Sequence, residues 1–170
     1  MSNVMVDLET LGNNSHSVII SLGAVVFDEN GLGETFYSRI CPQSCVDAGL
    51  QMDADTVMWW MQQSEQARAE FKRACMSLPV VLHDFAKWFP DKATIWGNGA
   101  TFDNVILSNA YAALKMSKPW KYNADRCYRT LKALYPQITP SKRTGTYHNA
   151  LDDAIYQADH AIVILRAMKS

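Results

Sequence analysis

The sequence predicts an α/β domain in which helices cover the faces of a mixed sheet. Two observations lead to this fold class. The first forty residues contain β-branched runs with strand-like patterns, whereas apolar residues from about position 53 onward recur every three or four residues. Short strand-like segments then alternate with helical ones, an order typical of α/β proteins. The length of 170 residues fits one domain spanning 1–170.

Three strands are expected at the start of the chain. Val4–Val6 is a short β-type run that ends at Asp7, and Ser17–Phe27 is rich enough in β-branched residues for a central strand. Asp28–Gly31 contains the Asn-Gly pair of a hairpin turn. The alternating segment Glu34–Ile40 then predicts the next antiparallel strand, so the chain should open as a three-stranded meander.

Helical periodicity dominates the rest of the sequence, interrupted by two short strands. We expect Asp55–Gln63, Ser64–Met76, Leu78–Phe89, Thr101–Lys115, Asp125–Leu134 and Asn149–Met168 to be helices, with Thr101 and Asp125 as caps, and Ala93–Trp96 and Lys121–Ala124 to be strands. Pro136–Gly145 is expected to be a polar loop.

The composition excludes several classes of protein. Hydrophobic residues make up 48% and charged residues 19%, values that argue against disorder, collagen and coiled coil. The formal net charge is −1, whereas a non-specific nucleic-acid coat protein would usually be basic. Any binding of nucleic acid should therefore depend on a local site rather than on the field of the whole molecule.

The sequence also predicts a cytoplasmic protein. Its longest apolar run, Val18–Phe27, is far too short to span a bilayer, and its first residues lack the basic region of a signal peptide, so no membrane partner is expected. The four cysteines fit reduced thiols in a cytoplasm. Cys41 and Cys45 have the spacing C-x3-C, but no second pair or nearby histidine completes a zinc site.

Two carboxylates follow the first strand directly. Asp7 and Glu9 are two residues apart, so on a strand they point to the same face. Such a pair is costly unless water or cations neutralise it, and hard oxygen ligands suit Mg²⁺ or Mn²⁺. An isolated D-x-E is more often only a solvated strand end.

Two further acidic positions occur at predicted element ends. Asp103 stands at a strand-to-helix junction, where it could equally favour the helix dipole. His148 precedes Asp152 and Asp153 near the start of the last helix. Helical spacing pairs His148 with Asp152 at i+4, but this argument lapses if His148 lies in the preceding loop. The spacing leaves both acids open.

Together and in this order, these residues resemble the motifs of the DEDDh family of 3′→5′ exonucleases. Asp7-Leu8-Glu9-Thr10 is similar to the first motif of that family, Asp103 to the second, and His148 with Asp153 to the third, H-x4-D. This resemblance favours Asp153 over Asp152. The Trp59-Trp60 pair and the compact length are most similar to the subgroup typified by the mycobacterial 3′→5′ exoribonuclease, often found in bacterial and phage genomes.

The resemblance implies an RNase H-like fold with strand order 3-2-1-4-5 and a two-metal site for Mg²⁺ or Mn²⁺. Asp7 would bridge both ions, Glu9 and Asp153 would hold the ion that carries the attacking water, and Asp103 would support the other. His148 would deprotonate that water, a role suited to a pKa near neutrality. The expected reaction releases nucleoside 5′-monophosphates from the 3′ end of single-stranded RNA or DNA. A homodimer is implied as well, because many relatives are homodimers.

Several residues are candidates for contact with the substrate. They are Thr10, Leu11, Trp59, Trp60, Asn104, Lys142 and Arg143. Thr10 and Leu11 resemble positions that line the terminal nucleotide, and a tryptophan could stack on a base, although each of these apolar residues could equally be core. Lys142 and Arg143 belong to a basic, hydroxyl-rich loop before His148 that could contact phosphates or simply be solvated.

Two other functions have to be compared with this one. A phosphatase of the haloacid-dehalogenase type also begins with an acid pair after a strand, but it needs aspartate at both positions, and the second acid here is Glu9. An exonuclease fold that has lost its chemistry would lack one of the five motif residues, and all five are present. The sequence does not discriminate RNA from DNA, a difference that rests on contacts with the 2′-hydroxyl.

Overall fold

The computed structural model describes residues 2–143, 145 and 148–169. Its centre is a five-stranded sheet of order β3-β2-β1-β4-β5, which confirms the predicted mixed sheet and its order. Strands β1, β2 and β3 are antiparallel neighbours, and β4 and β5 continue the sheet in parallel with β1. The strands are β1 (Asn3–Thr10), β2 (Ile19–Asp28), β3 (Gly31–Arg39), β4 (Thr94–Gly97) and β5 (Asp125–Cys127).

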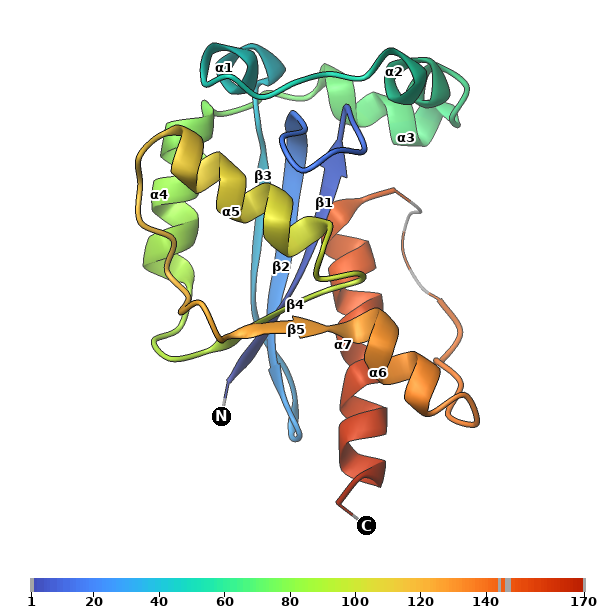
Figure 1. The fold of residues 1–170 in the computed structure, drawn as a ribbon. Coiled ribbons are helices and arrows are strands. Elements are labelled where there is room, and N and C mark those ends of the chain that lie inside the picture. Colours follow the sequence, from blue (N-terminus) through green and yellow to red (C-terminus); the bar gives the residue numbers. More distant parts are fainter. Residues whose placement is uncertain (1, 144, 146–147, 170) are drawn as a thin grey trace.

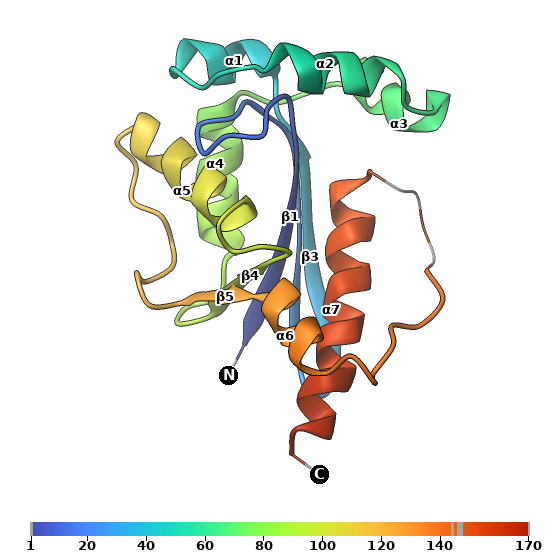
Figure 2. The same ribbon diagram turned by 45° about the vertical axis from the view of Figure 1, so that its right-hand side comes forward.

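Helices cover both faces of this sheet (Figures 1 and 2). α4 and α5 lie against one face, α6 and α7 lie against the other, and α1 to α3 lie across the end at which β1 finishes. Among the described residues, no helix is long and apolar enough to cross a membrane. The helices are α1 (Pro42–Asp47), α2 (Ala54–Met61), α3 (Glu65–Ala69), the 3₁₀ helix η1 (Glu70–Lys72), α4 (Leu78–Trp88), α5 (Asp103–Ala113), α6 (Tyr128–Leu134) and α7 (Ala150–Ala167).

The alternation of β1 decides which of its side chains can reach α7. Val4, Val6 and Leu8 belong to the core under α4 and α5, whereas Met5 belongs to the second core, which α7 closes. Successive strand residues point to opposite faces. The side chains of Asp7 and Glu9 therefore lie on the α7 face, where the apolar pattern of β1 stops.

Three predicted elements differ from the structure, and the predicted cap Thr101 is wrong because the N-cap of α5 is Phe102. β5 is Asp125–Cys127 rather than Lys121–Ala124, so Asp125 is a strand residue and the predicted cap is wrong. The N-cap of α6 is Cys127, which makes no side-chain capping bond. The predicted helix over Ser64–Met76 is reduced to α3 and η1, and α1 was not predicted because its six residues give too short a periodic pattern.

The expectation of four reduced thiols is wrong as well. Cys41 and Cys75 form a disulfide with a Cα–Cα separation of 5.1 Å. The two cysteines lie beside an isolated bridge between Ile40 and Met76, which brings the end of β3 next to the residues before α4. The sequence carries no sign of this pairing, because the cysteines are 34 positions apart and α1, α2, α3 and η1 lie between them.

Candidate active site

The first two acids are held at the carboxyl end of β1. In the antiparallel pair with β2, Asp7 lies opposite Gly23 and Glu9 lies opposite Ser21. One oxygen each of Asp7, Glu9 and Asp153 lies within 4.8 Å of the other two. Residues separated by almost the whole chain therefore present three carboxylates to one small volume.

The start of α7 reaches this volume because β2 carries a glycine there. A Cβ atom on Gly23 would lie 2.2 Å from the carbonyl carbon of Ala150 and 2.3 Å from the amide nitrogen of Leu151, so only a residue without a side chain permits this approach. The Asn149 side chain caps the helix by accepting hydrogen bonds from the amides of Leu151 and Asp152, both at 3.1 Å. The packing and the cap together fix where Asp153 projects.

Asp103 joins the site from the other side of β1. It follows β4 as the first residue of α5 and is only 4% exposed. Its Oδ1 accepts a hydrogen bond from the amide of Leu8 at 3.2 Å. This bond joins the start of α5 to the residue between Asp7 and Glu9. Gly97 leaves room for this arrangement, since a Cβ there would approach the Asp103 side chain to 3.1 Å.

Burial shifts the ionisation of two of these acids. Burial raises the pKa of Asp7 well above its usual value, and the neighbouring carboxylates Asp103, Glu9 and Asp153 raise it further. Gln157, four residues after Asp153 on α7, donates to Asp7 Oδ1 at 2.8 Å and partly offsets this shift. Burial likewise raises the pKa of Asp103 to about 7, despite hydrogen bonds from backbone amides that lower it.

The raised pKa values of Asp7 and Asp103 are those expected of a site that a bound cation would stabilise. The carboxylates repel one another and are poorly solvated, so ionising all of them is costly without a positive partner. Clustered carboxylate oxygens are the donors that hard divalent cations such as Mg²⁺ and Mn²⁺ prefer. The donor set thus fits the metal ions that the sequence predicted. Gln157 is a site residue that the motifs did not reveal, and its only sequence signal is the i+4 spacing from Asp153.

His148 precedes α7, the helix that carries Asp153, and lies outside it. Its backbone φ of 60° places it in the left-handed region, ahead of the cap residue Asn149. Its ring centroid lies 5.1 Å from that of Trp59 and 6.0 Å from that of Trp60, in edge-to-face contacts. The two tryptophans of α2 therefore form the wall against which the histidine rests.

The two tryptophans have different environments. Trp60 is 3% exposed and its Nε1 donates to the carbonyl of Thr10 at 2.8 Å, whereas Trp59 is 43% exposed. Thr10 is itself buried, with its hydroxyl donating to the carbonyl of Gly12 at 2.6 Å. Trp59 is thus the tryptophan whose surface a ligand can reach directly.

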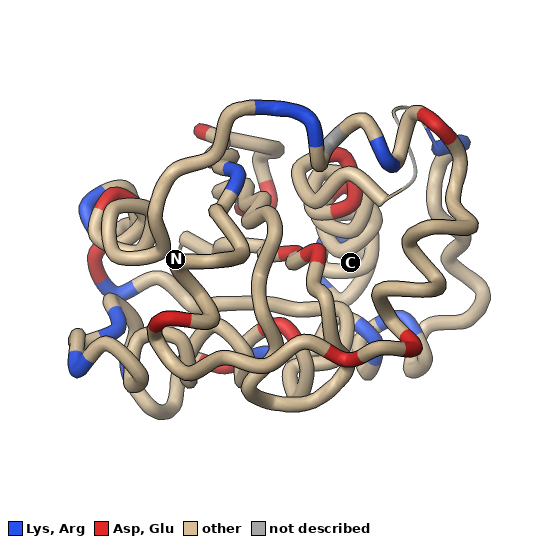
Figure 3. The backbone as a smooth tube through the Cα atoms, turned by 90° about the horizontal axis from the view of Figure 1, so that it is seen from above, with Lys and Arg blue, Asp and Glu red and all other residues tan. Residues whose placement is uncertain are grey.

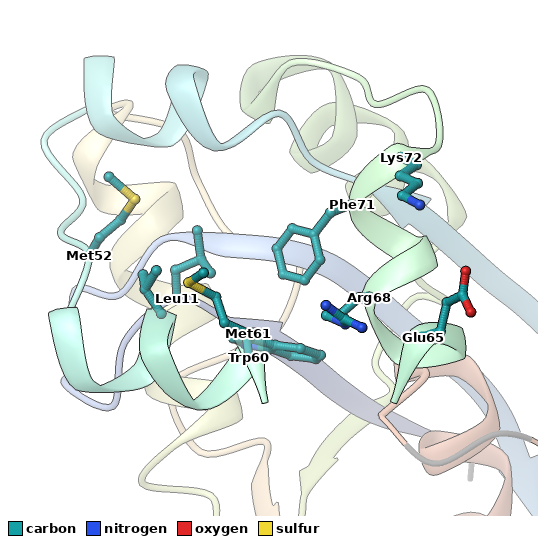
Figure 4. Close-up of a pocket in the computed structure, with 9 residues that line it drawn as sticks. Leu11, Met52, Trp60, Met61, Glu65, Arg68, Phe71 and Lys72 are labelled. Atoms are coloured by element: carbon teal, nitrogen blue, oxygen red, sulfur yellow. The ribbon is translucent and has the colours of Figure 1, made fainter. Parts of the chain in front are cut away.

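A cavity of about 510 Å³ opens on the other side of Trp60 (Figure 4). Its walls are mainly apolar, and Phe71 and Arg68 point into it while Glu65 points away. Trp60 lines this cavity and also contacts the ring of His148. The lining residues are Leu11, Met52, Val57, Trp60, Met61, Glu65, Arg68, Phe71 and Lys72.

The remaining predicted substrate residues differ in their exposure and in their bonding partners. Lys142 is exposed in the loop before α7, whereas Arg143 is mostly covered and pairs with Asp153 at 2.6 Å. Asn104 is 2% exposed, and its amide nitrogen donates to the carbonyl of Ile95 and to Asp125 Oδ1. Asn104 therefore links β4 to β5 through these hydrogen bonds, and its contact with the substrate stays a prediction.

Comparison with known structures supports the fold. The nuclease domain of 3′hExo, a DEDDh family member bound to rAMP, aligns with a TM-score of 0.66 and 16% identity over 98% of this chain and 92% of that one. Exonuclease X in complex with 5′ overhanging duplex DNA aligns with a TM-score of 0.63 and 15% identity, over 98% and 93%. E. coli ExoI with single-stranded DNA aligns with a TM-score of 0.62 and 16% identity, over 99% of this chain and 39% of ExoI.

Comparison of sequences identifies the family. No curated protein matches the chain. A family model does match, and it covers residues 2–165, a span that includes β1, both Asp103 and His148, and most of α7. The chain accordingly belongs to the family of Rv2179c-like 3′→5′ exoribonuclease domains and is a 3′→5′ exonuclease.

Proposed function

We propose that residues 1–170 form one metal-dependent exonuclease domain that degrades single-stranded nucleic acid or 3′ overhangs to nucleoside 5′-monophosphates. The observation that carries this proposal is the convergence of Asp7, Glu9 and Asp153 within 4.8 Å, next to the buried Asp103. A site of this kind suits hydrolysis of a phosphodiester, whose attacking and leaving oxygens both carry negative charge in the reaction.

The cofactors in this proposal are two Mg²⁺ or Mn²⁺ ions. Asp7, Glu9, Asp103 and Asp153 would hold them, and the ions would supply an activated water and a positive partner for the leaving oxygen. The raised pKa of Asp7 supports this assignment, because a buried carboxyl among acids gains most from a bound cation.

His148 is the proposed general base. It would take a proton from the attacking water, while the water oxygen forms a bond to the terminal phosphorus. The bond from that phosphorus to the 3′ oxygen of the penultimate nucleotide would break, and this oxygen would take up a proton and stay on the shortened strand as its new 3′-hydroxyl. The terminal nucleotide would leave with its 5′ phosphate. The position of His148 directly before the helix of Asp153, in contact with the rings of Trp59 and Trp60, supports this role.

The cavity beside Trp60 is the proposed place for the 3′-terminal nucleoside. Its apolar walls, including Leu11, suit a base, and Arg68 adds a cation within reach of a phosphate or of a base edge. Trp59, with its exposed ring next to His148, would stack on a neighbouring base. Lys142 would contact the backbone from the opposite side of the site.

RNA is the favoured substrate in this proposal, because the family is described as exoribonucleases. The test is digestion of matched 3′-tailed RNA and DNA duplexes with Mn²⁺, with products resolved by length. We expect stepwise shortening of the 3′ tail, faster for RNA, and release of nucleoside 5′-monophosphates. Release of inorganic phosphate from a small aryl phosphate, without shortening of either tail, would support the phosphatase alternative.

Variants of the acids test the site itself. Asp7→Asn, Glu9→Gln, Asp103→Asn and Asp153→Asn should each abolish nearly all hydrolysis while the protein stays folded. Asp152→Asn is the matched control on the same helix turn and should keep most activity. Near-wild-type rates in any of the first four would contradict the assignment. The cytoplasmic location and the homodimer stay predictions.

A further inference from the structure

The guanidinium of Arg143 is fixed against α7 by two contacts. Its Nη2 lies 2.6 Å from Asp153 Oδ1, and its central carbon lies 5.2 Å from the ring centroid of Tyr156. Asp153 and Tyr156 are three residues apart and so stand on the same side of the helix. The side chains of Arg143 and Asp153 are only 14% and 18% exposed, so solvent screens this ion pair much less than it screens a surface pair.

The same aspartate belongs to the acidic cluster of the active site. Asp153 offers an oxygen within 4.8 Å of oxygens from Asp7 and Glu9. A guanidinium 2.6 Å from this carboxylate therefore lies at the edge of the volume that a divalent cation would occupy. Like charges at such distances repel strongly in a partly buried site, so Arg143 and a metal ion cannot both be bound to Asp153 at full strength.

We propose that Arg143 is an exchangeable counter-ion of the active site, which couples metal binding to substrate binding. Without divalent cations Arg143 neutralises Asp153. When they bind, Arg143 releases this carboxylate, and its guanidinium becomes the donor that grips a phosphate of the strand. This inference rests on the proposed function and adds to it a residue that controls the order of binding.

The charge balance of the site explains why this exchange is useful. Four carboxylates are balanced by two divalent cations, so they leave no surplus positive charge to attract a phosphodiester. The released guanidinium supplies that surplus, and a planar guanidinium can bind two phosphate oxygens at once. Because coupling between two binding events is reciprocal, bound strand should also tighten the binding of metal ions.

The test measures metal binding in the absence of catalysis. Isothermal titration calorimetry with Mn²⁺ and no nucleic acid should give tighter binding for Arg143→Met than for the wild type, by about fivefold or more. Arg143→Lys keeps the charge and should lie between the two. Arg126→Met is the matched control, because Arg126 is exposed and its guanidinium donates to the backbone carbonyls of Asn123 and Asp125.

A second measurement follows the strand. Binding of a short single strand, held uncut by Ca²⁺, should weaken at least fivefold in Arg143→Met, and Ca²⁺ should no longer tighten it as much as in the wild type. Weaker Mn²⁺ binding in Arg143→Met would overturn the proposal, since it would mean that Arg143 orients Asp153 for the metal. Unchanged Mn²⁺ binding would overturn it too.

The outcome also separates this inference from the proposed function. If the wild-type protein itself binds no Mn²⁺, the metal-dependent function fails. If the wild type binds Mn²⁺ and shortens a 3′ tail but Arg143→Met behaves like it, only the counter-ion role fails. Thermal melting of each variant without metal checks folding, and should Arg143→Met be unfolded, Arg143→Lys and Arg143→Gln carry the same comparison.

Discussion

At the scale of single residues, the backbone of His148 explains why helical spacing does not pair it with Asp152. In a continuous helix the spacing would bring Asp152 next to His148. With φ at 60° and Asn149 as the cap, His148 lies outside the helix, and Asp153 rather than Asp152 joins the group with Asp7 and Glu9. The H-x4-D pattern thus depends on a helix that begins after the histidine.

His148→Ala should lower kcat by about 10²- to 10⁴-fold, because general-base catalysis contributes about that much. Single-turnover hydrolysis of a labelled strand measures this loss. Mn²⁺ binding, followed by calorimetry, should persist because His148 is not proposed as a ligand. Loss of the ions in this variant would require His148 to be reassigned as part of the metal site.

The two free cysteines among the described residues should differ in their reactivity with pH. Burial raises the pKa of Cys127, but hydrogen bonds from the Thr130 side chain and from backbone amides, including that of Ala100, lower it to a net value of about 7. Burial raises the pKa of Cys45 to about 11. Since the thiolate is the reactive form, alkylation of Cys127 should rise through pH 7 while Cys45 stays unmodified in the folded protein.

Intact-mass analysis after iodoacetamide pulses between pH 5 and pH 9 measures this difference. Cys127→Ser serves as the control and should remove the labelling. A rise in labelling centred near pH 8.5, the ordinary pKa of a cysteine, would show that the hydrogen bonds to Cys127 have no effect on its ionisation.

At the scale of elements, Gly23 is the contact that sets α7 against the sheet. Gly23→Ala would put a methyl group about 2.2 Å from the backbone of Ala150. The start of α7 would have to move, and overpacking of this kind costs about 1–3 kcal/mol in stability. Because Asp153 moves with the helix, we expect kcat to fall by more than the loss of stability alone explains.

Thermal melting and hydrolysis rates of Gly23→Ala test this role. Gly33→Ala on the neighbouring strand β3 is the control, since its new Cβ would lie no closer than 3.4 Å to Val26. Wild-type stability and wild-type rates in Gly23→Ala would contradict the view that this glycine positions the helix.

Elements with a strong local pattern could be predicted from the sequence. The meander, α4, α5 and α7 each carry a clear strand or helix period, and their residue ranges agree with the structure to within a few positions. β5 could not be located, because its two exposed charged residues and one cysteine carry no strand pattern and form a strand only through pairing with β4. Contacts between distant segments, such as Gly23 with α7, leave no periodic signal.

Within the site, too, residues in local motifs could be predicted, whereas contacts between distant segments could not. The five motif residues could be identified by resemblance, although Asp7 and Glu9 lie within β1 rather than after it. The hydrogen bond of Gln157 depends on how α7 lies against β1, and the pairing of Arg143 with Asp153 depends on the path of the loop before α7. Asn104 is predicted to contact the substrate because it follows Asp103 in sequence. Its hydrogen bonds to Ile95 and Asp125 could not be predicted, because they depend on how α5 lies against β4 and β5.

At the scale of the whole molecule, charge limits how the substrate is held. The chain has 16 basic and 17 acidic residues, and Figure 3 shows both kinds interspersed along the described backbone. Because the basic residues are dispersed, the affinity for a nucleic-acid strand should depend on a few cationic side chains near the site, such as Lys142 and Arg143, and on base stacking. Only a few phosphates can then be neutralised.

This limit predicts a shallow dependence of binding on salt. Each neutralised phosphate contributes roughly −0.7 to the log–log slope for a single strand, so a few contacts give a slope on the order of −1 to −3. Fluorescence anisotropy of a short labelled strand in Ca²⁺ measures it. Lys142→Met should make the slope shallower, whereas Trp59→Ala should leave the slope unchanged and weaken binding by about 1–3 kcal/mol for every base. A steep slope together with unchanged affinity in Trp59→Ala would point to an extended basic track and refute stacking as the main source of affinity.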